Sequence, residues 1–319
     1  MRETMSGVLV KSGVIEKART RIPSTAQFLR RVRADPRHLS YDLLPIVSTP
    51  RARARIARLI ALCRPKTAGF APSASACRLY RDLVTDGITP PLPPLPADVV
   101  EEIRRYFEAV PCHDPYRPHL GAFPFDAPAS PDTNMGYFSV AEILAAPHVL
   151  ALFNDPVVLE TAELFLGCKP LLDNIAGWWS FGGRPAARGT QRYHRDLDSL
   201  RGFKLFIYLT DVDVASGPHV FMRGSQASDR LDTGRALSDE TIHAAFGAEN
   251  ERIMTGPAGT RFLADTFGWH KGLLPMSGRR LMLVAQYNIN RTPHLPLRPV
   301  MAAPNSGYDP FVNRLILRS

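Results

Sequence analysis

Apolar and polar residues follow two different patterns along the chain, one before about residue 170 and one after it. In the first part, apolar residues recur at the spacing of amphipathic helices. In the second part, short runs rich in β-branched and aromatic residues alternate with Gly, Pro, Ser and Asp, which is typical of strands joined by turns. These runs are 171–180, 203–210, 219–222, 260–267 and 281–289. The pattern therefore predicts helices first, followed by a β sandwich or barrel.

Three helices are predicted ahead of the strands. The first runs from about Asp98 to Val110. Its apolar stripe consists of Val99, Ile103, Phe107 and Val110. Ser139, with Glu142 three residues later, matches a capping box at the start of the second helix. Asp155–Pro156 supplies the N-cap and first residue of the third helix, and Gly167 suits its C-terminal end.

The composition allows a full hydrophobic core and restricts the class of protein. Of the 319 residues, 45% are hydrophobic and 22% are charged, as in a globular domain. No apolar run approaches the length of about 18 residues that a membrane-spanning helix needs, so none is predicted. The four cysteines lie far apart without a Cys-x-x-Cys pair, which excludes a disulfide framework and a cysteine-ligated zinc site. They suit a reducing compartment, and a cytoplasmic location is predicted.

The net charge of +9 raises the question of nucleic-acid binding, but its distribution argues against it. Residues 1–70 contain 15 Lys and Arg against 4 Asp and Glu, while the remainder contains 24 against 26. A dedicated nucleic-acid enzyme is expected to carry basic residues across its body. We therefore predict a basic N-terminal extension at 1–78 and one folded domain at 79–319. Nucleic acid is not the expected partner, and the oligomeric state is left open.

Part of this extension has the pattern of a helix. At 51–63, Ile56, Leu59 and Ile60 stand near helical spacing among arginines. Such a helix either lies on an anionic surface or packs on the folded domain with its arginines in water. We favour the second interpretation.

The segment Tyr193–Asp198 contains candidate metal ligands. His194 and Asp196 are two residues apart, so in an extended chain both side chains point to the same face. His270 follows the run 260–267 and offers a second imidazole. Two histidines and one carboxylate form the facial triad that holds non-haem Fe(II) and leaves coordination positions open. The pattern alone is weak, because His-x-Asp is common and a local hydrogen-bonding role for His194 is the alternative.

Two arginines follow His270 in the last predicted strand. A guanidinium matches a carboxylate bidentately, so one of them is suited to the far carboxylate of a bound 2-oxoacid. Adjacent strand residues face opposite ways, so only Arg279 or Arg280 enters the interior. Arg280 shares its face with a mixed set, which is Met282, Val284, Gln286 and Asn288. Arg279 shares its face with a set typical of packing against helices, which is Leu281, Leu283, Ala285 and Tyr287. We favour Arg280.

Three stretches together resemble the phytanoyl-CoA dioxygenase-like family of Fe(II)/2-oxoglutarate-dependent oxygenases. They are YHRDLD at 193–198, FKLFIYLTDVDVASGPHVFMRGSQ at 203–226 and GTRFLADTFGWHKGLLPMSGRRLMLVAQY at 259–287. The family shares the His-x-Asp motif, the Leu-Thr-Asp turn, the Ser-Gly-Pro bend and an arginine shortly after the second histidine. Gln226 stands where the family's next corner has a histidine. The resemblance covers about residues 80–290 and does not explain 1–75 or the C-terminal end.

The resemblance implies an α+β protein whose core is a double-stranded β-helix, or jelly roll, flanked by N-terminal helices. It implies His194, Asp196 and His270 as ligands of Fe(II), and 2-oxoglutarate as a co-substrate held by Arg280. With O₂, the implied reaction of this dioxygenase domain is hydroxylation, or a related oxidation, of an unactivated C–H bond of a small molecule, for example in secondary metabolism. Halogenating relatives lack the carboxylate ligand, so Asp196 favours hydroxylation.

Neighbouring residues are candidates for the remaining contacts. For the co-substrate they are Arg279, Lys204 and Trp178. For the substrate they are Gln191, Tyr193, Asp198, Trp269 and Gln286. Lys204 is equally well explained by a side chain that extends to solvent, Trp269 by packing, and Gln191 and Tyr193 by a plain loop role. Two other functions stay open, which are a cupin-like metal-binding or sensing protein without turnover and a nucleic-acid demethylase that uses the basic N-terminus.

Overall fold

The computed structural model describes residues 29–30, 33, 47, 49–231, 235–292, 299–302 and 307–318, with the backbone alone at 301–302. Most of the predicted basic extension, at 1–28, 31–32, 34–46 and 48, lies outside the described residues. Within the described part of the chain, we find no helical segment with the length and apolar composition of a membrane span.

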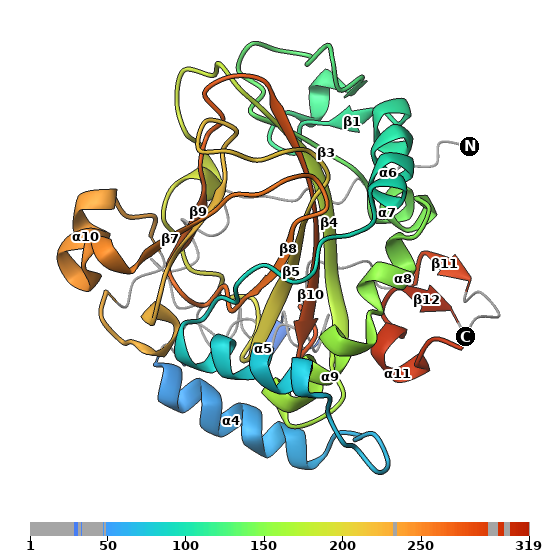
Figure 1. Cartoon of the computed structure of the whole chain (residues 1–319), viewed down its shortest axis with the longest axis vertical. Helices are drawn as coiled ribbons and strands as arrows, with labels where there is room; N and C mark the ends of the chain where they lie inside the picture. The colour runs from blue at the N-terminus through green and yellow to red at the C-terminus, as the bar shows by residue number, and fades with distance from the viewer. Residues whose placement is uncertain are drawn as a thin grey trace.

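Two antiparallel sheets form the centre of the molecule. The larger sheet has the strand order β2-β1-β3-β4-β10-β5-β8. Its bounds are β1 Cys112–His113, β2 Ala122–Phe123, β3 Met135–Tyr137, β4 Leu171–Phe181, β5 Gly202–Tyr208, β8 Arg261–Ala264 and β10 Arg279–Asn288. The smaller sheet has the order β7-β6-β9, with β6 His219–Met222, β7 Glu251–Met254 and β9 His270–Gly272. The smaller sheet lies opposite the larger one (Figure 1).

Two further pairings complete the strand arrangement. An isolated bridge joins His194 to His270, which places the His-x-Asp segment beside β9. A short parallel pair, β11 Met301–Ala302 and β12 Leu317–Arg318, lies near the C-terminus.

The predicted strand runs correspond to real strands, with differences at their ends. β6 occupies the predicted residues 219–222, and β4, β5 and β10 lie within two residues of their predicted bounds. The run 260–267 was predicted too long, because the strand ends at Ala264 and a turn follows, in which Gly268 N donates to Asp265 O at 2.9 Å. The strands β7 and β9 were missed.

Among the described residues, three helices precede β1 and three lie between β3 and β4. They are α4 Pro50–Leu62, α5 Ala74–Thr85, α6 Ala97–Ala109, α7 Val140–Ala145, α8 Val149–Phe153 and α9 Pro156–Leu166, followed later by α10 Asp239–Phe246 and α11 Pro310–Asn313. Short 3₁₀ turns are η1 Pro118–Leu120, η2 Gly189–Gln191, η3 Ser225–Ala227 and η4 Ala248–Asn250. Helices α6–α9 lie beside β4, and α4 and α5 lie at one end of the sheets (Figure 1).

The predicted helix signals are confirmed. Ser139 and Glu142 form the capping box of α7. Asp155 caps α9 by accepting from the amides of Val157 and Val158, and Gly167 ends that helix in the left-handed conformation at φ 75°. In α6 the buried apolar residues are Val100, Ile103 and Phe107, so Val100 takes the core position that was expected of Val99.

The helix predicted at 51–63 is α4, and it packs on the domain against α9 and η3. Its buried face is Arg53, Ala57 and Ala61, whereas Leu59 is 65% exposed. The expectation that every arginine of this helix lies in water is therefore wrong for Arg53, which donates to the carbonyl oxygens of Ser199 and Val47. The next helix, α5, spans position 78, where the boundary of the domain was expected.

Strand alternation separates two hydrophobic clusters. On β10, Leu281, Leu283, Ala285 and Tyr287 pack into the cluster formed with the helices. Met282 and Val284 face the other way, into the cluster between the two sheets. Arg280 lies on this inner face and is 2% exposed, which confirms the predicted orientation of the strand. The site is therefore built on the inner face.

Candidate metal centre

His194, Asp196 and His270 converge at one point between the sheets. Each residue offers one ligand atom, and these three atoms all lie within 4.8 Å of one another. His194 Nε2 is 3.6 Å from Asp196 Oδ1, and His270 Nε2 is 3.5 Å from Asp196 Oδ2. The convergence follows from the bridge between His194 and His270, together with the bond from Asp196 N to Thr266 O. Two nitrogens and one carboxylate oxygen in this arrangement are the donor set of a facial triad.

Both imidazoles are oriented by backbone carbonyls. His194 Nδ1 lies 2.9 Å from Arg192 O, and His270 Nδ1 lies 2.9 Å from Gly268 O. A carbonyl only accepts, so each Nδ1 carries the proton and each Nε2 presents its lone pair to the triad. Burial lowers the pKa of His270 to about 3, which keeps this imidazole neutral near pH 7. The residues are therefore arranged to bind a metal ion.

Lys204 is the charged partner of the triad carboxylate. Its Nζ lies 2.6 Å from Asp196 Oδ2, and the two side chains are 15% and 18% exposed. Burial alone would raise the pKa of Asp196, but the Lys204 ammonium and the two imidazoles outweigh burial and hold this pKa well below its usual range. The carboxylate is therefore ionised, as a metal ligand must be.

Arg280 extends the site along the inner face of β10. Its Nη2 donates to Ser180 Oγ at 3.1 Å, whereas Nε and Nη1 are buried and find no partner among the described residues. A Cβ atom on Gly272 would lie 3.6 Å from Arg280 Nη2, so this guanidinium lies against the strand that begins with His270. Buried guanidinium donors without acceptors are costly, and they indicate a place for an anion.

Two more buried nitrogens without a partner among the described residues lie on the same inner face. Trp178 stands opposite Met282 in the pairing of β4 with β10, and its Nε1 is buried without a partner in the described part of the chain. His219 begins β6, and its ring stacks on that of His270 at a centroid distance of 5.5 Å. His219 Nε2 is likewise buried and unpartnered among the described residues. Sequence reasoning missed His219, whose only signal was a histidine within an apolar strand.

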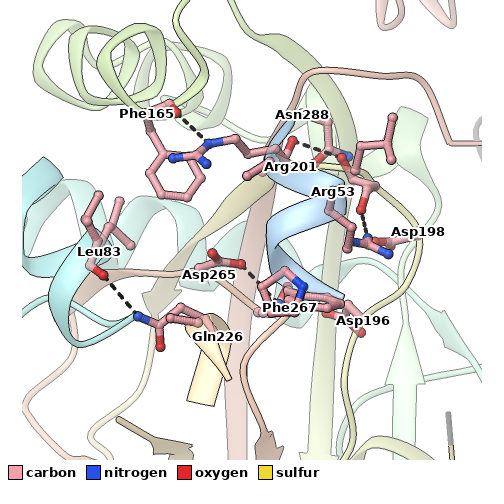
Figure 2. Close-up of a pocket in the computed structure, with 18 of the residues that line it drawn as sticks. Arg53, Leu83, Phe165, Asp196, Asp198, Arg201, Gln226, Asp265, Phe267 and Asn288 are labelled. Atoms are coloured by element: carbon pink, nitrogen blue, oxygen red, sulfur yellow. Dashed lines mark hydrogen bonds between the residues drawn. The ribbon is translucent and has the colours of Figure 1, made fainter. Parts of the chain in front are cut away.

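A cavity of about 270 Å³ adjoins the triad at Asp196. Asp198 and Gln286 line it as well, and Gln286 Nε2 donates to Asp198 Oδ1 at 3.2 Å. The cavity lies between the start of α4 and the ends of β5 and β10 (Figure 2). The predicted substrate candidates Asp198 and Gln286 are thus beside the metal ligand.

The structure separates the other candidates from the triad. Tyr193 and Trp269 pack with Ile242 of α10, because each is adjacent in sequence to a triad histidine and so points to the opposite face. Their prediction as substrate contacts is not supported by this placement. Arg279 is exposed and lies over the Phe125 ring at 5.1 Å. Gln191 accepts from Asn134 Nδ2 at 2.7 Å in the segment before the triad.

No protein-family model and no curated protein matches the sequence. Solved structures do match in fold. SnoN, a non-heme alpha-ketoglutarate-dependent epimerase from nogalamycin biosynthesis, is 19% identical, with a TM-score of 0.51 over 74% of this chain and 92% of its own. SnoK, a carbocyclase from the same biosynthesis, is 20% identical, with a TM-score of 0.48 over 70% and 86%. HygX from Streptomyces hygroscopicus, solved with nickel, 2-oxoglutarate and hygromycin B, is 16% identical, with a TM-score of 0.48 over 66% and 86%. From the match to SnoN, the chain shares the fold of a non-haem 2-oxoglutarate-dependent enzyme.

Proposed function

We propose that this protein is an Fe(II)- and 2-oxoglutarate-dependent dioxygenase that hydroxylates an unactivated C–H bond of a small molecule. The observation that carries the proposal is the convergence of His194, Asp196 and His270 with both Nε2 lone pairs directed to one point. We further infer that the two sheets are the halves of a double-stranded β-helix. From β5 to β10, the chain places β5, β8 and β10 in the larger sheet and β6, β7 and β9 in the smaller one.

The donor set suits ferrous iron. Three protein ligands on one face leave coordination positions for a bidentate co-substrate and for O₂. Iron, when bound, supplies the redox chemistry that couples decarboxylation of the co-substrate to oxidation of the substrate. Asp196 keeps one position occupied by a carboxylate, which favours hydroxylation over halogen transfer. Lys204 fixes the second oxygen of Asp196 and so keeps the carboxylate available through one oxygen.

The unpartnered donors near the triad suit a dicarboxylate. Arg280 Nε and Nη1 can grip the far carboxylate of 2-oxoglutarate, while the other end chelates the metal. Trp178 Nε1 lies on the same inner face and adds a donor without charge, and His219 Nε2 adds one in the tautomer that carries its proton on Nε2. We assign the co-substrate to this region because a bound carboxylate would satisfy donors that are otherwise buried without acceptors.

The test is a binding and turnover measurement on the purified chain. Titration with Ni(II), which is redox-inert here, should show one site, and 2-oxoglutarate should bind only after the metal. His270→Ala should lose both, and Asp196→Ala should lose hydroxylation. With Fe(II) and O₂, succinate should form at a low rate without substrate and faster with it. Absence of metal and 2-oxoglutarate binding would reject the proposal, whereas binding without succinate under any condition would leave a metal-binding protein without turnover.

A further inference from the structure

The cavity beside Asp196 is lined by side chains of both charges. It is about 270 Å³ in volume and is bounded by the first turn of α4, the segment 196–202 and the segment 265–267. A water molecule occupies about 30 Å³ of liquid, so the space corresponds to roughly nine waters or to one molecule of amino-acid size. The cavity reaches the triad at Asp196, which lines it.

Arg201 forms the cationic part of the cavity. Its Nε donates to Phe165 O at 2.7 Å, and its guanidinium lies 4.3 Å over the Phe165 ring. These contacts hold the side chain in place, yet they use one of its nitrogens. The two terminal nitrogens donate to no acceptor among the described residues and are not fully buried, so they are free to donate to a molecule in the cavity. A carboxylate has the geometry that such a fork binds.

Asp265 forms the anionic part. Its Oδ1 accepts from Phe267 N at 3.2 Å, and within the described chain no Lys or Arg nitrogen lies in ion-pair distance of it. The Arg201 guanidinium is the cation that lowers the pKa of Asp265 most. Asp265 is the anion that raises the pKa of Arg201 most. Both side chains line the same cavity, and no hydrogen bond or ion pair joins them within the described chain. Figure 2 shows both on the same side of the pocket, with Asp196 and Asp198 on the other side.

We propose that the substrate of this site is an α-amino acid, or a small molecule that ends in one, with its carboxylate on Arg201 and its ammonium on Asp265. The space between the two side chains then holds the carboxylate and the ammonium, which an α-amino acid carries on the same carbon atom. Its side chain points toward Asp196 and passes Asp198 and Gln286, which offer an acceptor and a donor. A ligand with one charge only would pair with one of the two protein charges, whereas an α-amino acid pairs with both. Oxidation of this amino acid rests on the proposed function, whereas its binding to Arg201 and Asp265 does not.

The experiment is a thermal-shift and calorimetric screen of the full chain, loaded with Ni(II) and 2-oxoglutarate, against the twenty standard L-amino acids. At least one of them should raise the melting temperature. Its N-acetyl derivative and its amide should lose the effect, since each removes one of the two charges. Arg201→Gln and Asp265→Asn should each weaken binding on the order of 30-fold or more, with folding checked by circular dichroism.

Matched controls are available on the surface. Arg223 is exposed and, like Arg201, donates to a backbone carbonyl, here Glu249 O at 3.3 Å, so Arg223→Gln should bind as the parent does. Asp211 accepts from one backbone amide, Ala258 N at 2.8 Å, and Asp211→Asn is the control for Asp265→Asn. No response across the panel, equal binding of the blocked derivatives, or loss in the controls as well would overturn the inference.

The same data separate this inference from the proposed function. If Ni(II) and 2-oxoglutarate bind but no amino acid does, the substrate class is wrong and the dioxygenase assignment stands. If an amino acid binds through Arg201 and Asp265 but 2-oxoglutarate does not bind, the cavity is an amino-acid site and the dioxygenase assignment falls.

Discussion

Lys204 shows how one side chain connects the stability of the site to its chemistry. Its ammonium lies 2.6 Å from the carboxylate of Asp196, on a strand whose other inner residues are apolar. Removing one partner of a buried ion pair costs about 3 to 5 kcal/mol, because the other charge stays buried. A metal ion at the triad would place a second positive charge beside the Asp196 carboxylate, next to the Lys204 ammonium.

Lys204→Met should therefore destabilise the metal-free protein by roughly 3 kcal/mol, and metal should recover much of that loss. The measurement is the melting temperature in chelator and in excess Ni(II). The metal-induced increase should be larger in Lys204→Met than in the parent. Lys169→Met is the matched control, because Lys169 Nζ pairs with Asp309 Oδ2 at the same 2.6 Å away from the triad. An equal metal response in all three proteins would show that Lys204 is not coupled to the site.

The two adjacent arginines make a second prediction at this scale. Arg280 faces the inside, where two of its nitrogens have no partner in the part of the chain that the structure describes, while Arg279 is exposed beside Phe125. Loss of a charge-assisted bidentate contact amounts to about 2 to 3 kcal/mol, or on the order of 100-fold in affinity. Arg280→Gln should weaken 2-oxoglutarate binding by that factor in calorimetry with Ni(II) present, and Arg279→Gln should leave it unchanged. The reverse result would exchange the two assignments.

The spacing of residues predicted the triad, but not the direction of every neighbouring side chain. His194, Asp196 and His270 could be found because His-x-Asp and a later histidine form a spaced motif. Tyr193 and Trp269 were candidates because they adjoin the triad histidines in sequence, and strand alternation turns both to the opposite face, where they pack with Ile242. His219 was missed because its neighbours in space, Phe206 and His270, come from other strands.

At the scale of elements, Asp155 links a helix to the sheet. Its Oδ1 caps α9, while its Oδ2 lies 2.7 Å from Arg261 Nη1 on β8. Asp155→Asn should keep the cap and lose the ion pair, which costs about 1 kcal/mol for a partly buried pair. Asp155→Ala should lose both and cost about 2 to 3 kcal/mol. Urea denaturation of the two variants measures the difference.

Ser139→Ala is the reference variant for Asp155→Ala, because it removes the capping box of α7 and breaks no ion pair. It should lower the free energy of unfolding by about 1 kcal/mol. If Asp155→Asn and Asp155→Ala are equally stable, the cap contributes nothing and the prediction fails.

Strong local signals predicted the elements, and weak signals did not. Caps and long apolar runs located α7, α9, β4, β5 and β10 within two residues, because their interactions are local. β9 has three residues, His270–Gly272, and no apolar run, so it depends on its pairing with β6 and on the bridge to His194. The triad depends on that strand, and its position was therefore fixed by a partner that lies far away in sequence.

For the whole molecule, the sequence pattern did not predict the order of the strands in the sheets. β10 pairs with β4 and β5, and β5 pairs with β8, so neighbours in the larger sheet are distant along the chain. Periodicity reports which face of a strand is buried, but it carries no information on which strand lies beside it. The family resemblance supplied an expected architecture, and the strand order tests it independently.

Global stability should depend on pH through Asp265. Burial raises the pKa of its carboxyl to about 6, although Arg201, Arg53 and Arg195 oppose the shift. The unfolded chain ionises Asp265 near pH 4, while the folded chain retains the proton up to about pH 6. The contribution of this group to stability is therefore complete below about pH 4 and is lost as the pH rises through about 6.

Asp265→Asn removes this titration while it keeps a side-chain oxygen for Phe267 N. Without ligand, the variant should be more stable than the parent at about pH 7.5, by on the order of 1 to 2 kcal/mol after solvent screening is allowed for, and equal to it near pH 4. Urea denaturation at several pH values measures the difference, and other titrating groups cancel because both proteins share them. A variant that is less stable at every pH would mean that the carboxylate is needed as an acceptor. In that case the role of the carboxylate as an acceptor for Phe267 N would explain an aspartate at this position, and its charge would give no support to a cationic ligand group.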